Sequence, residues 1–175
     1  MTKFGIGQSV SRFEDPRLLR GRGCFVDDIN LPGQAYAVLV RSPHANAHIR
    51  SINLEPALQS PGVLAVYTGD DVARDGLGTM KINLPRKRPD GSPLFARAHT
   101  GLTRGRVRYV GDPVALVVAE TQAQAEAAAQ RIHIAYEQLP VVTDPSAAMQ
   151  PDAPPLHPDP VRFPYGARDL RSNVL

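Results

Sequence analysis

The sequence has few of the residues on which redox, stacking and membrane functions depend. Of its 175 residues only Cys24 is a cysteine, so an internal disulfide and a four-thiolate iron–sulfur cluster are excluded within this chain. Tryptophan is absent and aromatic residues make up 6%, which argues against a stacking platform for single-stranded nucleic acid. No apolar run reaches the roughly 18 residues of a membrane span, and the N-terminus has no apolar signal segment. We therefore expect a cytoplasmic protein without membrane contact.

The residues that are present favour a single domain with a real core. The formal charge of +3 and the pI near 9.3 are too mildly basic to identify a nucleic-acid partner. Arginine supplies most of the positive charge, and arginine is as common at protein interfaces as at phosphates. Because Cys24 stands beside apolar Phe25 and Val26, we predict that its side chain is a small core filler and no reactive thiol.

The clearest folding signal is the stretch 105–144, which predicts strand, helix and strand with almost no loop. Residues 114–118 form an apolar run typical of a strand covered on both faces. Thr121 is placed as a helix N-cap, with Gln124 completing a capping box. The helix then presents one apolar stripe, formed by Ala125, Ala128, Ala129 and Ile132. From Ile132 the apolar residues recur at every second position, which predicts a strand.

Further elements are expected between residues 34 and 75. Apolar runs predict strands at 36–41, 48–54 and 63–67, the last of them buried. The alternation of the second strand slips near Ser51, which indicates a bulge. Short helices are predicted at 55–59 and 71–74.

The flanking segments define the expected domain organisation. Residues 1–23 have no sustained period and are predicted to be an extended arm, followed by the domain at 24–145. Within that domain, residues 75–104 form a long basic loop centred on Arg86-Lys87-Arg88, which is functional, interfacial or disordered. Residues 146–175 are rich in proline, a composition that favours an extended, semi-rigid connector.

Two pairs of glycines and three histidines are candidate binding residues. Neither Gly5-Ile6-Gly7 nor Gly21-Arg22-Gly23 follows a strand, opens a helix or supplies a third glycine, so a phosphate loop is not predicted. His44 and His48 have zinc-ligand spacing on a helix, but Pro43 and the strand-like residues after it favour a loop and a strand start. His133 is expected on the solvent side of its strand.

None of the paired carboxylates or serines is predicted to be a catalytic residue. Asp27-Asp28 and Asp70-Asp71 are adjacent in sequence, so each pair points apart and is better explained by turns and helix caps. Ser42 and Ser51 lack a histidine and aspartate context. We assign no catalytic, cofactor-binding or metal-ligating residue in 1–175, and no cofactor within this chain.

Five stretches in series resemble one known family, the large molybdenum-binding subunit of xanthine dehydrogenases and aldehyde oxidases. The opening EDPRLLRGRG is most similar to the carbon monoxide dehydrogenase group. The stretches are RFEDPRLLRGRGCFVDDINLPG, RSPHANAHIRSI, PGVLAVYTGDDV, RVRYVGDPVALVVAET and YEQLPVVTD. The resemblance implies the N-terminal α/β hammerhead domain, an α+β fold with two helices on a small mixed sheet.

The resemblance also implies a function for the complete enzyme. Such enzymes hydroxylate an aldehyde or N-heterocycle with water as the oxygen source, or oxidise carbon monoxide. They use a molybdenum pterin, with [2Fe-2S] clusters and FAD in other domains or subunits. The expected partners are therefore molybdenum-binding domains, absent from residues 1–175, and iron–sulfur and FAD subunits.

We accordingly predict a scaffold and interface domain of a molybdenum hydroxylase, an oxidoreductase in which this segment is not catalytic alone. The alternative is a small basic nucleic-acid-binding protein, in which Arg86-Lys87-Arg88 would contact phosphates. A self-sufficient small enzyme is rejected, because the sequence offers no nucleophile motif, metal cluster or phosphate loop.

Overall fold

The computed structural model describes residues 11–80, 87, 91 and 99–156, together with the backbone of residues 161–162 and 169–170. The chain divides into two compact units, Met1–Gln34 and Ala35–Leu175, and each is described by itself. Residues 24–34, which the sequence assigned to the domain, fall in the first unit.

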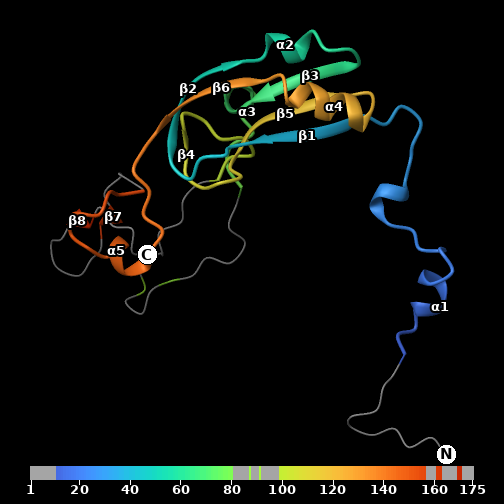
Figure 1. The fold of residues 1–175 in the computed structure, drawn as a ribbon, viewed down its shortest axis with the longest axis horizontal. Coiled ribbons are helices and arrows are strands. Elements are labelled where there is room, and N and C mark those ends of the chain that lie inside the picture. Colours follow the sequence, from blue (N-terminus) through green and yellow to red (C-terminus); the bar gives the residue numbers. More distant parts are fainter. Residues whose placement is uncertain are drawn as a thin grey trace, which may run out of the picture. The chain divides into compact units, whose positions relative to one another are not determined.

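The described part of the first unit, residues 11–34, contains one helical turn and one 3-10 turn (Figure 1). Helix α1 (Asp15–Leu18) begins with Pro16 in its first turn, where the missing N–H costs nothing. In η1 (Val26–Asp28) the carboxylate of Asp28 accepts a hydrogen bond from the Phe25 N–H at 2.9 Å. The described part of the predicted arm is thus not uniformly extended.

The prediction for Cys24 is wrong, because its side chain is exposed. Its apolar neighbours Phe25 and Val26 are also exposed, at 67% and 82%. An apolar run of three residues does not ensure burial, because burial requires an apolar surface to pack against. The described residues of the first unit, 11–34, do not cover these side chains.

The second unit is built around the strand β5 (Pro113–Ala119), the centre of a three-stranded sheet. It pairs antiparallel with β1 (Tyr36–Arg41) on one side and β3 (Val63–Thr68) on the other. The predicted apolar run is confirmed, since most of β5 is buried. The expectation that the strand at 63–67 is buried is wrong in part: β3 is an edge strand, and Leu64 and Tyr67 are 58% and 43% exposed.

A second antiparallel sheet joins β4 (Arg106–Val107), β2 (Ala47–Asn53) and β6 (His133–Gln138) in the order β4-β2-β6. The predicted bulge is confirmed, because the pairing of β2 with β6 shifts register between Ile49 and Ser51. Ile52 and Ile134 contact both clusters of buried side chains, so the two sheets share one core.

Helix α4 (Gln122–Ala129) lies against β1 and β5, as Figure 1 shows. Its N-cap is confirmed: the hydroxyl of Thr121 accepts the Gln124 N–H at 3.3 Å. The alanine stripe is confirmed too, since Ala125 and Ala128 have no exposed surface. Side chains this small let the helix backbone approach the sheet closely.

The remaining helices are short: α2 (Glu55–Leu58), α3 (Gly69–Arg74) and α5 (Pro145–Ala148). The proline-rich segment contains α5, capped by Asp144 through the Ala147 N–H at 2.7 Å, and a pair of strands. These strands, β7 (Val161–Arg162) and β8 (Asp169–Leu170), run antiparallel. The segment is therefore not extended throughout its described part.

The α+β hammerhead class is confirmed, and the arrangement of its strands differs from the single mixed sheet that was expected. Every strand pair in the named sheets is antiparallel. The reason is the path after α4: β6 does not return beside β5 but pairs with β2 in the other sheet. The strand–helix–strand unit thus bridges two sheets.

Candidate functional site

The histidines singled out in the sequence lie apart. His44 precedes β2, and its ring meets the ring of Tyr136 edge-on, with centroids 4.9 Å apart. His48 lies within β2, opposite Glu137 of β6. His133 is exposed at the start of β6, as predicted. Each histidine has a place in a sheet or in its flanking loop.

One member of each carboxylate pair, Asp28 and Asp71, caps a helical turn, as predicted. Asp71 accepts the Thr68 N–H at 2.7 Å and the Thr68 hydroxyl at 2.8 Å, which caps α3. These hydrogen bonds, with a smaller contribution from Arg74, lower the pKa of Asp71 below its usual 3.8. Its neighbour Asp70 points elsewhere and pairs with Arg104.

A buried polar cluster surrounds Asp112, in the turn before β5. The Asp112 side chain is 4% exposed and accepts hydrogen bonds from the Thr103 hydroxyl and from the Arg108 N–H, the latter at 3.0 Å. Its carbonyl accepts the Ser42 N–H at 2.9 Å. The aspartate thus ties together the ends of β1 and β5 and the loop before β4, which is a structural role.

Tyr136 lies next to this cluster with its hydroxyl buried. That hydroxyl has no well-oriented hydrogen-bond partner in the part of the chain that the structure describes. Burial raises the pKa of Tyr136. The nearby Ser42 hydroxyl lowers this pKa, and the negative charge of Asp112 raises it further. The Ser42 hydroxyl already exchanges two hydrogen bonds of 3.0 Å with the backbone of His44, so it is not poised as a nucleophile.

Arg106 and Asn46 form a second polar junction, between the core and the proline-rich segment. Nε of Arg106 donates to Oδ1 of Asn46 at 2.9 Å, and a terminal nitrogen of Arg106 donates to the Pro155 carbonyl at 3.4 Å. Nδ2 of Asn46, a side chain only 5% exposed, donates to the Pro140 carbonyl at 2.8 Å. The start of the connector is therefore hydrogen-bonded to the core.

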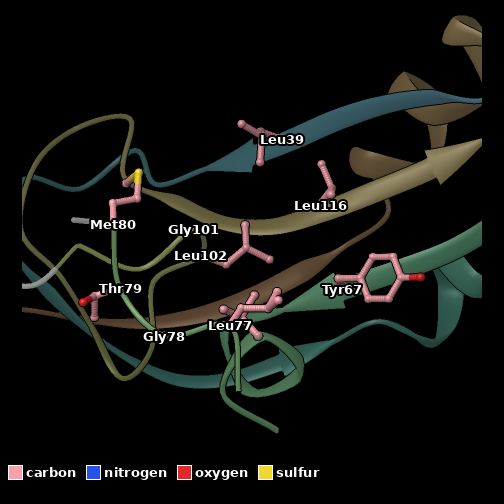
Figure 2. Close-up of a pocket in the computed structure, with 10 residues that line it drawn as sticks. Leu39, Tyr67, Leu77, Gly78, Thr79, Met80, Gly101, Leu102 and Leu116 are labelled. Atoms are coloured by element: carbon pink, nitrogen blue, oxygen red, sulfur yellow. The ribbon is translucent and has the colours of Figure 1, made fainter. Parts of the chain in front are cut away.

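An apolar groove lies on the face of the β1-β5-β3 sheet (Figure 2). Leu39, Leu116 and Tyr67 stand opposite one another in the register of the three strands and form its floor. Leu77, Met80 and Leu102 contribute from adjoining segments. The groove has a volume of about 480 Å³, and none of its described lining residues carries a charge.

Sequence reasoning missed this groove. The three floor residues are 28 or more positions apart in sequence, and only the strand register brings them into line. The available signal was an apolar residue at an outward position of each strand, which is too common to identify a site.

The described residues contain no group of three or more His, Cys, Asp and Glu side chains that could hold a metal ion. A smaller pocket beside Asp112 includes Arg104 and His99, but its volume of about 210 Å³ is below the range of roughly 300–1,000 Å³ usual for ligand sites.

Two expectations about surfaces remain. Arg86 and Arg88 lie outside the described residues, and Lys87 between them is exposed. No helix in the described part of the chain is long and apolar enough to cross a bilayer.

The fold and the site define a class: an α+β domain with two small antiparallel sheets, a buried polar turn and one open apolar groove. The family model for the aldehyde oxidase and xanthine dehydrogenase a/b hammerhead domain matches residues 20–140. The chain belongs to this family, as its sequence motifs predicted.

Among similar proteins is the nicotine 6-hydroxylase large subunit of Paenarthrobacter nicotinovorans, 40% identical over 150 residues; the match covers 86% of this chain and 18% of that one. The xanthine dehydrogenase molybdenum-binding subunit of Escherichia coli O157:H7 is 41% identical over 139 residues, with 78% and 18% covered. The crystal structure of the Cu,Mo-CO dehydrogenase superposes with a TM-score of 0.72 at 36% identity, covering 94% of this chain and 20% of that one. The chain spans about one fifth of the length of these relatives.

Proposed function

We propose that this chain is the scaffold and interface domain of a molybdenum-dependent hydroxylase. The complete enzyme would hydroxylate an aldehyde or N-heterocycle with water as the oxygen source, or oxidise carbon monoxide. The observation that carries the proposal is the hammerhead match over residues 20–140 in a chain one fifth as long as its relatives. The geometry agrees, because the described polar side chains hold turns and junctions together and form no reactive cluster.

The chemistry belongs to other parts of the proposed enzyme. A molybdenum pterin in the remaining domains of the large subunit, with [2Fe-2S] clusters and FAD in partner domains or subunits, would supply oxidation and electron transfer. The residues of this chain would position those domains. The hydrogen bonds of Arg106 and Asn46 to the connector fit that task, since they fix where the connector leaves the core.

The N-terminal segment and the basic loop at 75–104 are proposed contacts to the molybdenum domains or the iron–sulfur subunit. In the first unit four arginines accompany exposed apolar side chains such as Phe13 and Leu19, at 98% and 85%. Charge reversal at Arg86, Lys87 and Arg88 should weaken assembly of the complete enzyme. Unchanged assembly would remove the loop from the interface.

A chimera tests the proposed function. Residues 20–140 would replace their counterpart in the nicotine 6-hydroxylase large subunit, the relative that is 40% identical. We expect the chimera to assemble at the same size as the native subunit and to retain molybdenum, measured by gel filtration and metal analysis. A chimera that stays soluble but neither assembles nor binds molybdenum would contradict the proposal.

A further inference from the structure

Among the residues that the structure describes, the apolar groove on one face of the central sheet stays open to solvent. On the opposite face α4 buries Ala125 and Ala128 completely. On the groove face Leu39 and Tyr67 are 38% and 43% exposed, and Leu77 and Met80 at the rim are 72% and 64% exposed. Figure 2 shows these side chains coming from β1, β3 and the segment after α3 around one hollow.

Apolar surface of this kind is costly in water. Apolar surface left in water forgoes hydrophobic stabilisation, and contiguous apolar patches on soluble proteins usually mark interaction sites. The groove is therefore a surface that another apolar group should cover.

Resting on the proposed function, we infer that an apolar polypeptide segment of the remaining large-subunit domains fills this groove. The segment packs aliphatic or aromatic side chains onto the groove floor formed by Leu39, Leu116 and Tyr67. The relatives have about four fifths of their length outside the region that this chain matches, and that length supplies the occupant.

The chemistry of the groove argues against two other classes of occupant. Small-molecule sites bury roughly 70–90% of their ligand, whereas rim residues as exposed as Leu77 and Met80 leave this groove open to solvent. Nucleic acid requires cations for its phosphates, and no described lining residue is charged. A second copy of the chain is distinguished by the oligomeric state of chain 1–175.

Gly101 shapes the space that the occupant enters. A Cβ added there meets no atom within 4 Å, and the backbone of Gly101 does not have a positive φ. A leucine at this position can therefore be accommodated by the fold while it fills part of the groove. Filling the groove with a larger side chain and placing a charge in it are thus two independent ways to prevent an apolar segment from binding there.

The test uses three variants of the same chimera, each with a single substitution: Leu116→Arg, Leu39→Glu or Gly101→Leu. We expect each to lower the assembled, molybdenum-containing fraction by about tenfold or more, because a buried unpaired charge or a filled pocket opposes docking. Leu58→Arg is the matched control: Leu58 is 52% exposed on α2, does not line the groove, and should leave assembly unchanged. Circular dichroism melting of chain 1–175 with each change establishes that the domain still folds.

The outcomes separate the two proposals. If the unmodified chimera assembles and all folded groove variants assemble equally well, the groove inference is overturned and the proposed function stands. If the unmodified chimera fails, the proposed function fails first. A chain 1–175 that dimerises through the groove, and becomes monomeric with Leu116→Arg, would overturn the inference in favour of a second copy.

Discussion

The hydroxyl of Thr103 donates a hydrogen bond to Oδ1 of Asp112, and both side chains are buried. The contact holds the loop before β4 against the turn that starts β5. The Thr103 N–H also donates to the Pro113 carbonyl at 2.7 Å, so backbone and side chain of one residue fix the same turn. A buried carboxylate is tolerated here because its two oxygens have donors.

Replacing Thr103 by valine should therefore destabilise the domain. The change keeps the shape but removes the donor to Asp112, at a cost of about 1–3 kcal/mol in the free energy of unfolding. Thr103→Ser, which keeps the hydroxyl, should retain most of the stability. Thr79→Val, at an exposed position, serves as the control. Urea denaturation measures all three, and equal midpoints for Thr103→Val and the native chain would contradict this role of the contact.

The alanine face of α4 allows a second prediction, from overpacking. Ala128 has no exposed surface, so Ala128→Leu must push the helix away from the sheet and should cost about 1–3 kcal/mol. Ala127 is exposed on the same helix, and Ala127→Leu should change stability by less than about 0.5 kcal/mol. Thermal unfolding of the pair measures the difference, and similar melting temperatures would show that the helix does not depend on close approach.

Gly69, at the start of α3, should not tolerate a side chain. An added Cβ would lie 2.7 Å from the carbonyl oxygen of Thr103, and backbone cannot move aside cheaply. We expect Gly69→Ala to lower the free energy of unfolding by about 1–3 kcal/mol. Gly101→Ala meets no atom within 4 Å and should be neutral or stabilise by up to about 1 kcal/mol. Chemical denaturation of the two variants tests this, and equal effects would show that Gly69 is not sterically restricted.

The cap at Asp71 should make stability depend on pH in the acid range. Because the pKa of Asp71 is lowered in the folded chain, its contribution is complete above the unfolded value of 3.8. The contribution is lost as the pH falls through the folded pKa. Asp71→Asn should remove this part of the acid dependence, whereas Asp75→Asn, just after α3, should leave it in place. Melting curves recorded between pH 2 and pH 7, a range that includes the titration of ordinary carboxyl groups, measure how the stability of each variant depends on pH.

Removing the hydrogen bonds of Arg106 to Asn46 and to Pro155 should increase the local opening of the connector near residues 145–156. Arg106→Met removes donors to Asn46 and Pro155, and each such hydrogen bond contributes about 1 kcal/mol. Amide hydrogen exchange in residues 145–156 should become roughly fivefold faster. Arg50→Met, which removes an exposed ion pair with Glu137, should leave exchange there unchanged. Equal exchange in both variants would show that the junction does not hold the connector.

Much of the local structure could be predicted from the sequence. The Thr121 cap, the alanine stripe of α4 and the bulge near Ser51 were all expected, because each depends on residues a few positions apart. The same applies to the carboxylates, since Asp28 and Asp71 bond to backbone three residues away. Local hydrogen bonds and periodicity leave a direct trace in the sequence.

The failures have a common cause. Cys24 was assigned to a core because of its two neighbours, but exposure depends on whether a distant segment covers it. The mixed sheet was expected from the family, yet β6 leaves the first sheet and pairs with β2. Neither outcome is determined by residues close in sequence.

Residues close together in the chain are enough to predict the family motifs and the strand at 114–118. The pairing of the strands and their register depend on segments far apart in the sequence. That register aligns Leu39, Leu116 and Tyr67 on one uncovered face, and it brings Arg106 to Asn46 across 60 residues. The physical reason is that a shift of one residue in strand pairing moves every side chain to the opposite face, so register is fixed by packing of the whole core.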